Sequence, residues 1–308
     1  MIAGAGSISD GSRWPIRSML YVPATRPDWV IKAINADAEA TILDLEDSVA
    51  ANDKSKARAL IAHEIETLRS HGVCAFVRPN QMNAGGIEDI YACVRPGLTG
   101  IILPKATVED VMLAHDALSY AEGRSGLRHN DVSIVALPET AEAVRSGYDI
   151  AKASSRVRGL LGGVGIIEGD LAWTCGFRPT LEGHEQLYLQ SKLIIDSRAA
   201  GAIYPMAAIF SPRLDDFATV TMLARRAKQL GFTGGAAIHP SHIGAINATF
   251  RPTEQEVAHY EGLIAALKDG LRNGRGAVQY KGAMIDLAML PIARDVVDEA
   301  RRRRERAK

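Results

Sequence analysis

The chain has 308 residues, of which 47% are hydrophobic and 23% charged, as in an ordinary soluble globular protein. Its 36 basic residues balance 36 acidic ones, so no global field attracts nucleic acid or an anionic membrane. No apolar stretch reaches the roughly 18 residues of a membrane span, and three cysteines without metal-ligand spacing fit a reducing compartment. We therefore expect a cytoplasmic protein.

Short apolar runs alternate with amphipathic helical stretches along most of the chain. The runs are rich in β-branched residues, which is typical of strands buried on both faces. The expected strands are 17–22, 40–45, 73–78, 99–103, 132–137, 157–161, 203–209 and 235–238. The expected helices are 26–36, 54–70, 86–94, 107–121, 140–153, 184–200, 214–230 and 241–248.

Eight strand–helix units predict an α/β fold in which residues 15–250 form one (β/α)8 TIM barrel. A doubly wound open sheet is the competing fold, but no GxGxxG turn follows the first strand, and the glycine-rich segment 162–169 reads as a loop. Residues 1–14 are rich in glycine, serine and alanine, which predicts a flexible N-terminus.

The alternation stops after Phe250. Residues 251–308 predict a C-terminal helical extension, with one helix over 253–270, a glycine-rich turn, and a last helix from about 291. Its apolar surface is too small for an independent core. We therefore expect the extension to pack on the barrel or on a neighbouring subunit.

Charged or polar residues follow the ends of several expected strands. They are Asp44, Glu46, Asp47, Arg78, Lys105, Glu139 and His239. The carboxyl ends of parallel barrel strands open on one face, where catalysis takes place in this fold. The sequence therefore predicts one site that several strands build together. An ion pair with Asp44 or Glu46 in that site is one interpretation of Arg78.

Eight ordered motifs make the chain similar to the citrate lyase β-subunit-like branch of the HpcH/HpaI aldolase family. They are RSMLYVPATRP (17–27), ILDLEDSVAANDKSKAR (42–58), VRPN (77–80), LPK (103–105), PETA (138–141), DLAWTCG (170–176), IHPSHIGAINATFRP (238–252) and GAMID (282–286). The resemblance covers nearly the whole chain. It implies a TIM barrel that binds Mg²⁺ and cleaves or forms carbon–carbon bonds of hydroxyacyl thioesters.

The resemblance assigns Glu139 and Asp170 as the two metal ligands, with Glu139 also contacting substrate, and Arg78 as the catalytic arginine that holds it. Carboxylates suit this role because Mg²⁺ prefers oxygen ligands and usually takes one or two of them from the protein. The loop before Asp170 is longer than in the family by roughly four residues, which leaves Glu168 as a rival ligand. From its residues alone, Glu139 also reads as an acidic residue at a helix start.

Coenzyme A needs cationic partners for its phosphates, and the resemblance offers Arg17, Arg26 and Lys54 as substrate-binding residues. An exposed position on a solvated helix face is the competing interpretation for Lys54. His239 is either a substrate ligand or a structural residue.

The resemblance implies that Asp286 reaches the site of a neighbouring subunit as a catalytic general base, in a homotrimer or a hexamer. Asp286 stands between apolar residues, which predicts partial burial, and a helix-capping role is the alternative.

The function implied is that of a Mg²⁺-dependent lyase acting by retro-Claisen chemistry on a 3-hydroxyacyl-CoA such as malyl-CoA or citramalyl-CoA. Three alternatives remain open: a citrate lyase component acting on a citryl-acyl carrier protein within a complex, an acyl-CoA thioesterase, and a CoA-independent aldolase that yields pyruvate.

Overall fold

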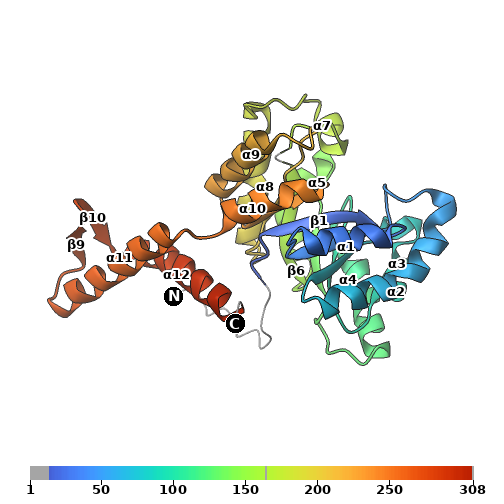
Figure 1. Cartoon of the computed structure of the whole chain (residues 1–308), viewed down its shortest axis with the longest axis horizontal. Helices are drawn as coiled ribbons and strands as arrows, with labels where there is room; N and C mark the ends of the chain where they lie inside the picture. The colour runs from blue at the N-terminus through green and yellow to red at the C-terminus, as the bar shows by residue number, and fades with distance from the viewer. Residues whose placement is uncertain (1–13, 164, 307–308) are drawn as a thin grey trace. The chain divides into compact units, whose positions relative to one another are not determined.

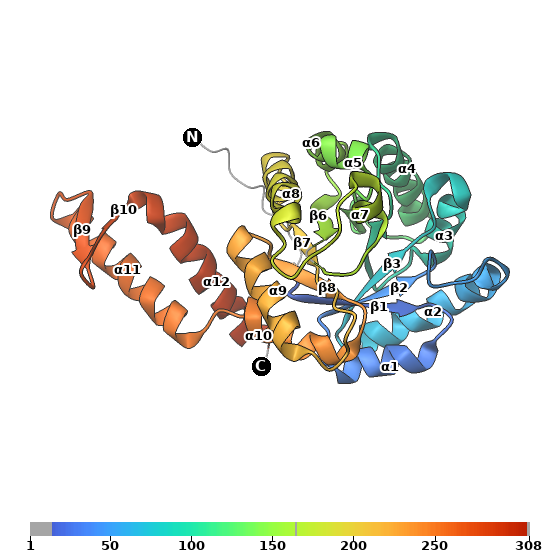
Figure 2. The same cartoon turned by 90° about the horizontal axis from the view of Figure 1, so that it is seen from above.

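The computed structural model describes residues 14–163 and 165–306. The chain divides into two compact units at Phe250 (Figures 1 and 2). Nearly all of the expected flexible segment 1–14 lies outside the described residues. Within those residues, no helix combines the length and the apolar character needed to cross a membrane.

The first unit is a closed barrel of parallel strands, which confirms the predicted fold. Each strand pairs with the next in chain order, and β8 pairs with β1. The strands are β1 (Ser18–Pro23), β2 (Ala40–Asp44), β3 (Cys74–Arg78), β4 (Leu98–Leu103), β5 (Ser133–Ala136), β6 (Val157–Gly163), β7 (Met206–Ala208) and β8 (Gly234–Ala237). The closed ring brings all eight carboxyl ends to one face.

Helices surround the ring on its outside (Figure 2). They are α1 (Pro27–Asn35), α2 (Lys54–Ser70), α3 (Gly86–Cys93), α4 (Val108–Arg124), α5 (Ala141–Arg145), α6 (Gly147–Lys152), α7 (Asp170–Cys175), α8 (Leu187–Ala199), α9 (Phe217–Leu230) and α10 (Ile243–Phe250), with short 3-10 turns between some of them. The predicted start of α4 is confirmed, because Thr107 and Asp110 form a reciprocal capping box.

The interior of the barrel is filled with side chains from alternate strand positions. Trp14 stacks on Tyr204 at 5.1 Å and meets the edge of Phe76 at 6.1 Å between ring centroids. These aromatic rings close the amino-terminal end of the barrel. The opposite end, where the strands end in polar residues, is therefore the one available for a site.

The second unit has helix α11 (Glu254–Arg272), strands β9 (Ala277–Tyr280) and β10 (Ala283–Asp286), and helix α12 (Leu290–Arg306). The expectation of a purely helical extension without a core was incomplete. The strands form an antiparallel hairpin whose two turn residues, Lys281 and Gly282, both have positive φ, as a tight hairpin turn requires. Its own small cluster buries Leu263, Leu267, Ile285 and Ala293.

Candidate active site

A cavity of about 340 Å³ opens at the carboxyl ends of the strands. Strand-end residues line one part of it, and residues 163–186, between β6 and α8, supply much of the rest. Four of its lining residues carry charge: Asp44, Arg78, Glu139 and Asp170. The structure therefore brings together the arginine and both carboxylates that the sequence singled out.

Arg78 is held by carboxylates from the end of β2. Its Nε and Nη2 each donate to one oxygen of Asp44 at 2.7 Å, and its Nη1 lies 3.0 Å from Glu46 Oε2. Asp47 is exposed and lies further away, at 3.8 Å. Asp44 also accepts from the backbone N–H groups of Glu46 and Ser48, so the turn after β2 is fixed around the arginine. This pairing aims the remaining guanidinium N–H groups at the cavity.

Tyr21 on β1 supports the same guanidinium. The Arg78 guanidinium carbon lies 5.0 Å from the centroid of the Tyr21 ring, within the range of a cation–π contact. Burial raises the pKa of the Tyr21 phenol, and Arg78 only partly opposes this. The phenol is therefore neutral at working pH.

Lys105 connects the two candidate metal ligands. Its backbone N–H donates to Glu139 Oε2 at 3.2 Å, and its Nζ lies 2.9 Å from Asp170 Oδ2. Lys105 has a φ of 46°, a left-handed conformation that costs on the order of 1–3 kcal/mol for a residue other than glycine. Strained backbone of this kind gathers at functional sites, and here it directs one residue at both carboxylates.

Two acidic side chains of the site are hard to ionise. Burial raises the pKa of Glu139 to about 7, although the Lys105 N–H opposes it. Burial also raises the pKa of Glu46 to about 7, although Arg78 opposes it. Asp44 differs: burial opposes its ionisation too, but the bonds from Arg78 hold its pKa below the usual range. Carboxylates with such different tendencies in one cavity are typical of acid–base or metal-binding sites.

The donor set fits Mg²⁺. Among the described residues, no group of three or more histidine, cysteine, aspartate or glutamate side chains forms a complete metal cage. Mg²⁺ usually takes only one or two protein carboxylates and leaves its other positions to water and substrate. Glu139 and Asp170 supply that number at the cavity wall. A cation there would also stabilise the buried Glu139 in its charged form.

The rival ligand Glu168 is exposed and does not line the cavity, whereas Asp170 begins α7 and does. Glu139 does not belong to a helix. It precedes Thr140, whose hydroxyl caps α5 by accepting from the N–H of Ala143.

Two of the expected coenzyme A contacts lie on segments that follow β1 and β2. Arg26 is exposed, pairs with Asp28 at 2.9 Å, and stacks 4.2 Å from the ring of Trp29, which lines the cavity. Lys54 donates from Nζ to the carbonyl oxygens of Leu45 and Glu46 at 2.6 Å, so it fixes the turn that carries Glu46.

His239 follows β8 and lies outside the cavity lining, although its neighbour Ile238 lines it. Its Nδ1 lies 2.7 Å from the hydroxyl of Ser241. Burial lowers the pKa of the His239 imidazole, and His242 and Lys32 add to this. These contacts are those of a structural residue.

Arg17 is not brought to the site. It precedes β1, at the amino-terminal end of the barrel, and pairs with Glu39, which precedes β2, at 2.7 Å. The expectation of a substrate contact there was wrong in position, because a motif match does not tell which end of a strand its residues occupy. An ion pair at this end of a TIM barrel serves stability.

Asp286 ends β10 in the second unit and is exposed, so the expected partial burial is not found. Its Oδ1 accepts from the N–H of Ala288 at 2.9 Å, which is the capping role considered from the sequence.

Two residues of the site, Lys105 and Tyr21, had no role assigned to them from the sequence. Lys105 is a charged residue that follows an expected strand, and this position alone could have identified it as a candidate site residue. Tyr21 carries no such signal, because an aromatic residue in an apolar strand reads as core.

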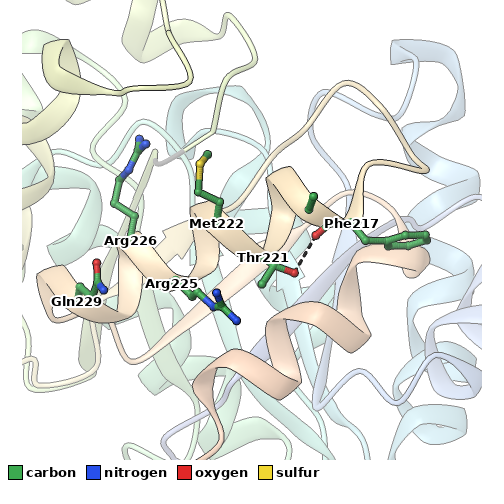
Figure 3. A pocket seen from close by; sticks show the side chains of 7 residues that line it. Phe217, Thr221, Met222, Arg225, Arg226 and Gln229 are labelled. Atoms are coloured by element: carbon green, nitrogen blue, oxygen red, sulfur yellow. Dashed lines mark hydrogen bonds between the residues drawn. The ribbon is translucent and has the colours of Figure 1, made fainter.

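A separate hollow lies on the outer surface of α9 (Figure 3). Its lining includes Phe217, Met222, Arg225 and Arg226 but no carboxylate. Arg226 donates to the carbonyl of Leu181. The residues that line the hollow all belong to α9 and to none of the strand ends.

The chain resembles known proteins along most of its length. The model of the HpcH/HpaI aldolase/citrate lyase family matches residues 17–240. Citrate lyase subunit beta of Escherichia coli strain K12 is 30% identical over 288 residues, 92% of this chain and 93% of that protein. L-malyl-CoA/beta-methylmalyl-CoA lyase of Cereibacter sphaeroides is 30% identical over 303 residues, 93% of this chain and 95% of that protein.

The crystal structure of CitE from Mycobacterium tuberculosis in complex with magnesium, acetoacetate and coenzyme A is also similar. The match has a TM-score of 0.70 and 27% sequence identity, and it extends over 94% of this chain and 99% of the CitE chain. The family match, the similar proteins and the barrel fold all fit a candidate active site in the cavity at the carboxyl ends of the strands. The chain belongs to the HpcH/HpaI aldolase/citrate lyase family and is a carbon–carbon lyase.

Proposed function

We propose that the protein is a Mg²⁺-dependent lyase that cleaves or forms the carbon–carbon bond of a 3-hydroxyacyl-CoA such as malyl-CoA or citramalyl-CoA. The observation that carries the proposal is the pair Glu139 and Asp170, joined through Lys105 and sharing a cavity with Arg78. Relatives named for malyl-CoA cleavage and a similar structure with magnesium and coenzyme A support it.

Cleavage requires three electronic changes. The hydroxyl of the substrate loses its proton to a base, the electron pair of the carbon–carbon bond moves onto the thioester part as an enolate, and the enolate carbon takes up a proton. The products are a 2-oxo acid and a shorter acyl-CoA. The site must therefore stabilise negative charge on an oxygen.

Arg78 suits that task. Asp44 and Glu46 fix its fork before substrate arrives, so the guanidinium needs no reorganisation when the enolate oxygen gains charge. Glu139 and Asp170 would hold Mg²⁺, which polarises a bound oxygen as a Lewis acid when present. Lys105 holds the two carboxylates in place.

We assign the general base, which takes the hydroxyl proton of the substrate, to Asp286 of a neighbouring copy in a homotrimer or hexamer. Asp286 is exposed and stands between Met284, 77% exposed, and Leu287, 46% exposed. Exposed apolar side chains around an exposed carboxylate are suited to docking on another subunit. Arg26 and Lys54 remain the candidates for the phosphates of coenzyme A, since both follow strand ends of the site face.

A purified chain offered malyl-CoA, citramalyl-CoA, citryl-acyl carrier protein and the free hydroxy acids, each with Mg²⁺ and with a chelator, tests the proposal. We expect metal-dependent cleavage of a CoA thioester by the chain alone. Activity only on the carrier-protein substrate would favour the citrate lyase role, which the similarity to citrate lyase subunit beta also suggests. Activity only on free acids would indicate the CoA-independent aldolase.

A further inference from the structure

The cavity is chemically divided. Its charged groups come from strand ends and the start of α7, whereas an apolar wall covers another part of it. We define this apolar wall as Leu137, Leu161, Ile167, Leu171, Phe177 and Phe210. Three of these side chains, Ile167, Leu171 and Phe177, belong to the segment between β6 and α8.

The apolar wall begins next to the candidate metal ligands. Leu171 follows Asp170 directly in α7, and Leu137 stands two residues before Glu139. A substrate whose carboxylate and hydroxyl would be bound through Mg²⁺ held by these acidic residues has the apolar wall beside it for the remaining substituent of the same carbon. Burying an alkyl group there is favourable because it removes apolar surface from water.

A second carboxylate on the substrate finds no second cation among the described residues that line the cavity, because Arg78 is already assigned to the enolate oxygen. Among the described residues that line it, Arg78 is the only cation, and three acidic residues line it as well. Arg78 is already paired with Asp44 and Glu46. A carboxymethyl substituent would lie against apolar side chains without a counter-charge, which is costly.

The segment that carries the wall is held in place. Gln186 is 3% exposed, and its Nε2 donates to the carbonyl of Gly165 at 3.2 Å. Its Oε1 accepts from Gln190 at 3.4 Å. Both polar ends of this buried amide thus have partners in the protein, so it positions the segment and is not available to bind a polar substituent.

We propose, on the basis of the proposed function, that the enzyme selects a 3-hydroxyacyl-CoA whose hydroxyl-bearing carbon carries one carboxylate and an alkyl group larger than methyl. The alkyl group packs on the apolar wall. Cleavage gives acetyl-CoA and a 2-oxo acid with an alkyl chain, by the same balanced steps as above.

Two substitutions change the room at the wall in opposite directions. Leu171→Ala removes side-chain atoms from it. Gly163→Ala adds a methyl group that would meet Leu171 Cδ2 and Gln186 Oε1 at 3.9 Å, an ordinary contact distance, so the change fits without a clash. Leu187→Ala, at an exposed position outside the cavity lining, and Gly244→Ala, at a glycine with open space around it, are matched controls.

The experiment measures kcat/KM with Mg²⁺ for CoA thioesters that differ only at the hydroxyl-bearing carbon. The substituents are hydrogen, methyl, ethyl, propyl, isobutyl and carboxymethyl. For the wild type we expect kcat/KM to rise at least 10-fold from methyl to the best larger alkyl group, since one methylene in an apolar pocket changes it roughly 10- to 200-fold. Carboxymethyl should rank below hydrogen.

Leu171→Ala should move the optimum to a longer alkyl group and Gly163→Ala to a shorter one, while both controls keep the wild-type order. A flat series, an optimum at hydrogen or methyl, a preference for carboxymethyl, or equal losses on all substrates in Leu171→Ala would overturn the inference, and the last would indicate a contact with the coenzyme A arm. Each of these outcomes leaves the proposed function standing. Cleavage of none of the thioesters overturns the proposed function and the inference with it.

Discussion

Replacement of Glu46 by glutamine tests the electrostatics around Arg78. The Glu46 side chain is 6% exposed, and burial raises its pKa from 4.5 to about 7. A carboxyl group whose pKa is higher in the folded state stabilises the fold at low pH, and this contribution is lost as the pH rises through the folded-state value. The wild type should therefore lose stability between about pH 4.5 and pH 7 because of Glu46.

The size of this effect follows from the difference between the ordinary pKa of Glu46, 4.5, and its pKa in the folded protein, about 7. Each pH unit between 4.5 and about 7 corresponds to about 1.4 kcal/mol, so the full effect is about 3 kcal/mol. Glutamine keeps the shape and does not ionise. The free energy of unfolding of Glu46→Gln, relative to wild type, should rise by up to about this amount from pH 4 to pH 8.

Urea unfolding followed by tryptophan fluorescence measures this difference. All three tryptophans, Trp14, Trp29 and Trp173, lie in the barrel unit, so the signal reports on the unit that holds the site. Glu88→Gln, at an exposed position on α3, is the control. Because the Glu46 charge also raises the pKa of Glu139, the difference reports on Glu46 together with its coupling to Glu139. Parallel stability curves from pH 4 to pH 8 would refute the reasoning.

Three further results are expected. Arg78→Lys keeps the charge but loses the planar fork, so kcat in steady-state kinetics should fall about 100- to 1,000-fold. A higher KM with unchanged kcat would instead show that Arg78 only binds the substrate. Glu139→Gln and Asp170→Asn should each weaken Mg²⁺ binding in calorimetry, and unchanged affinity in both removes the metal assignment. Asp286→Asn mixed with Glu139→Gln should regain part of the activity after subunit exchange. If mass spectrometry verifies exchange and no activity returns, Asp286 does not act on a neighbour.

The barrel could be predicted from the sequence because its strands are mostly apolar runs that alternate with helical stretches. Where prediction failed, a single tertiary contact decided the outcome. The expected helix 140–153 is broken at Ser146, where Gly147 lies so close to α8 that a Cβ would stand 2.6 Å from Asp196. The hairpin of the second unit has strands of only four residues, too short for a clear alternation.

The candidate site was predicted in part. Polar residues at strand ends indicated the correct face, and the ion pair of Arg78 with Asp44 followed from that geometry. Arg17 was misplaced because it precedes its strand. The contact of Lys105 with both Glu139 and Asp170 depends on a left-handed backbone at Lys105, and no local sequence pattern signals that conformation.

Mass spectrometry of the products formed from citramalyl-CoA in H₂¹⁸O with Mg²⁺ tests the proposed chemistry most directly. Carbon–carbon cleavage at the site of Arg78, Glu139 and Asp170 predicts acetyl-CoA with its thioester intact, formed in step with pyruvate and abolished by a chelator. Free CoA together with citramalate that carries ¹⁸O in its carboxyl group would contradict this, because it would show hydrolysis of the thioester.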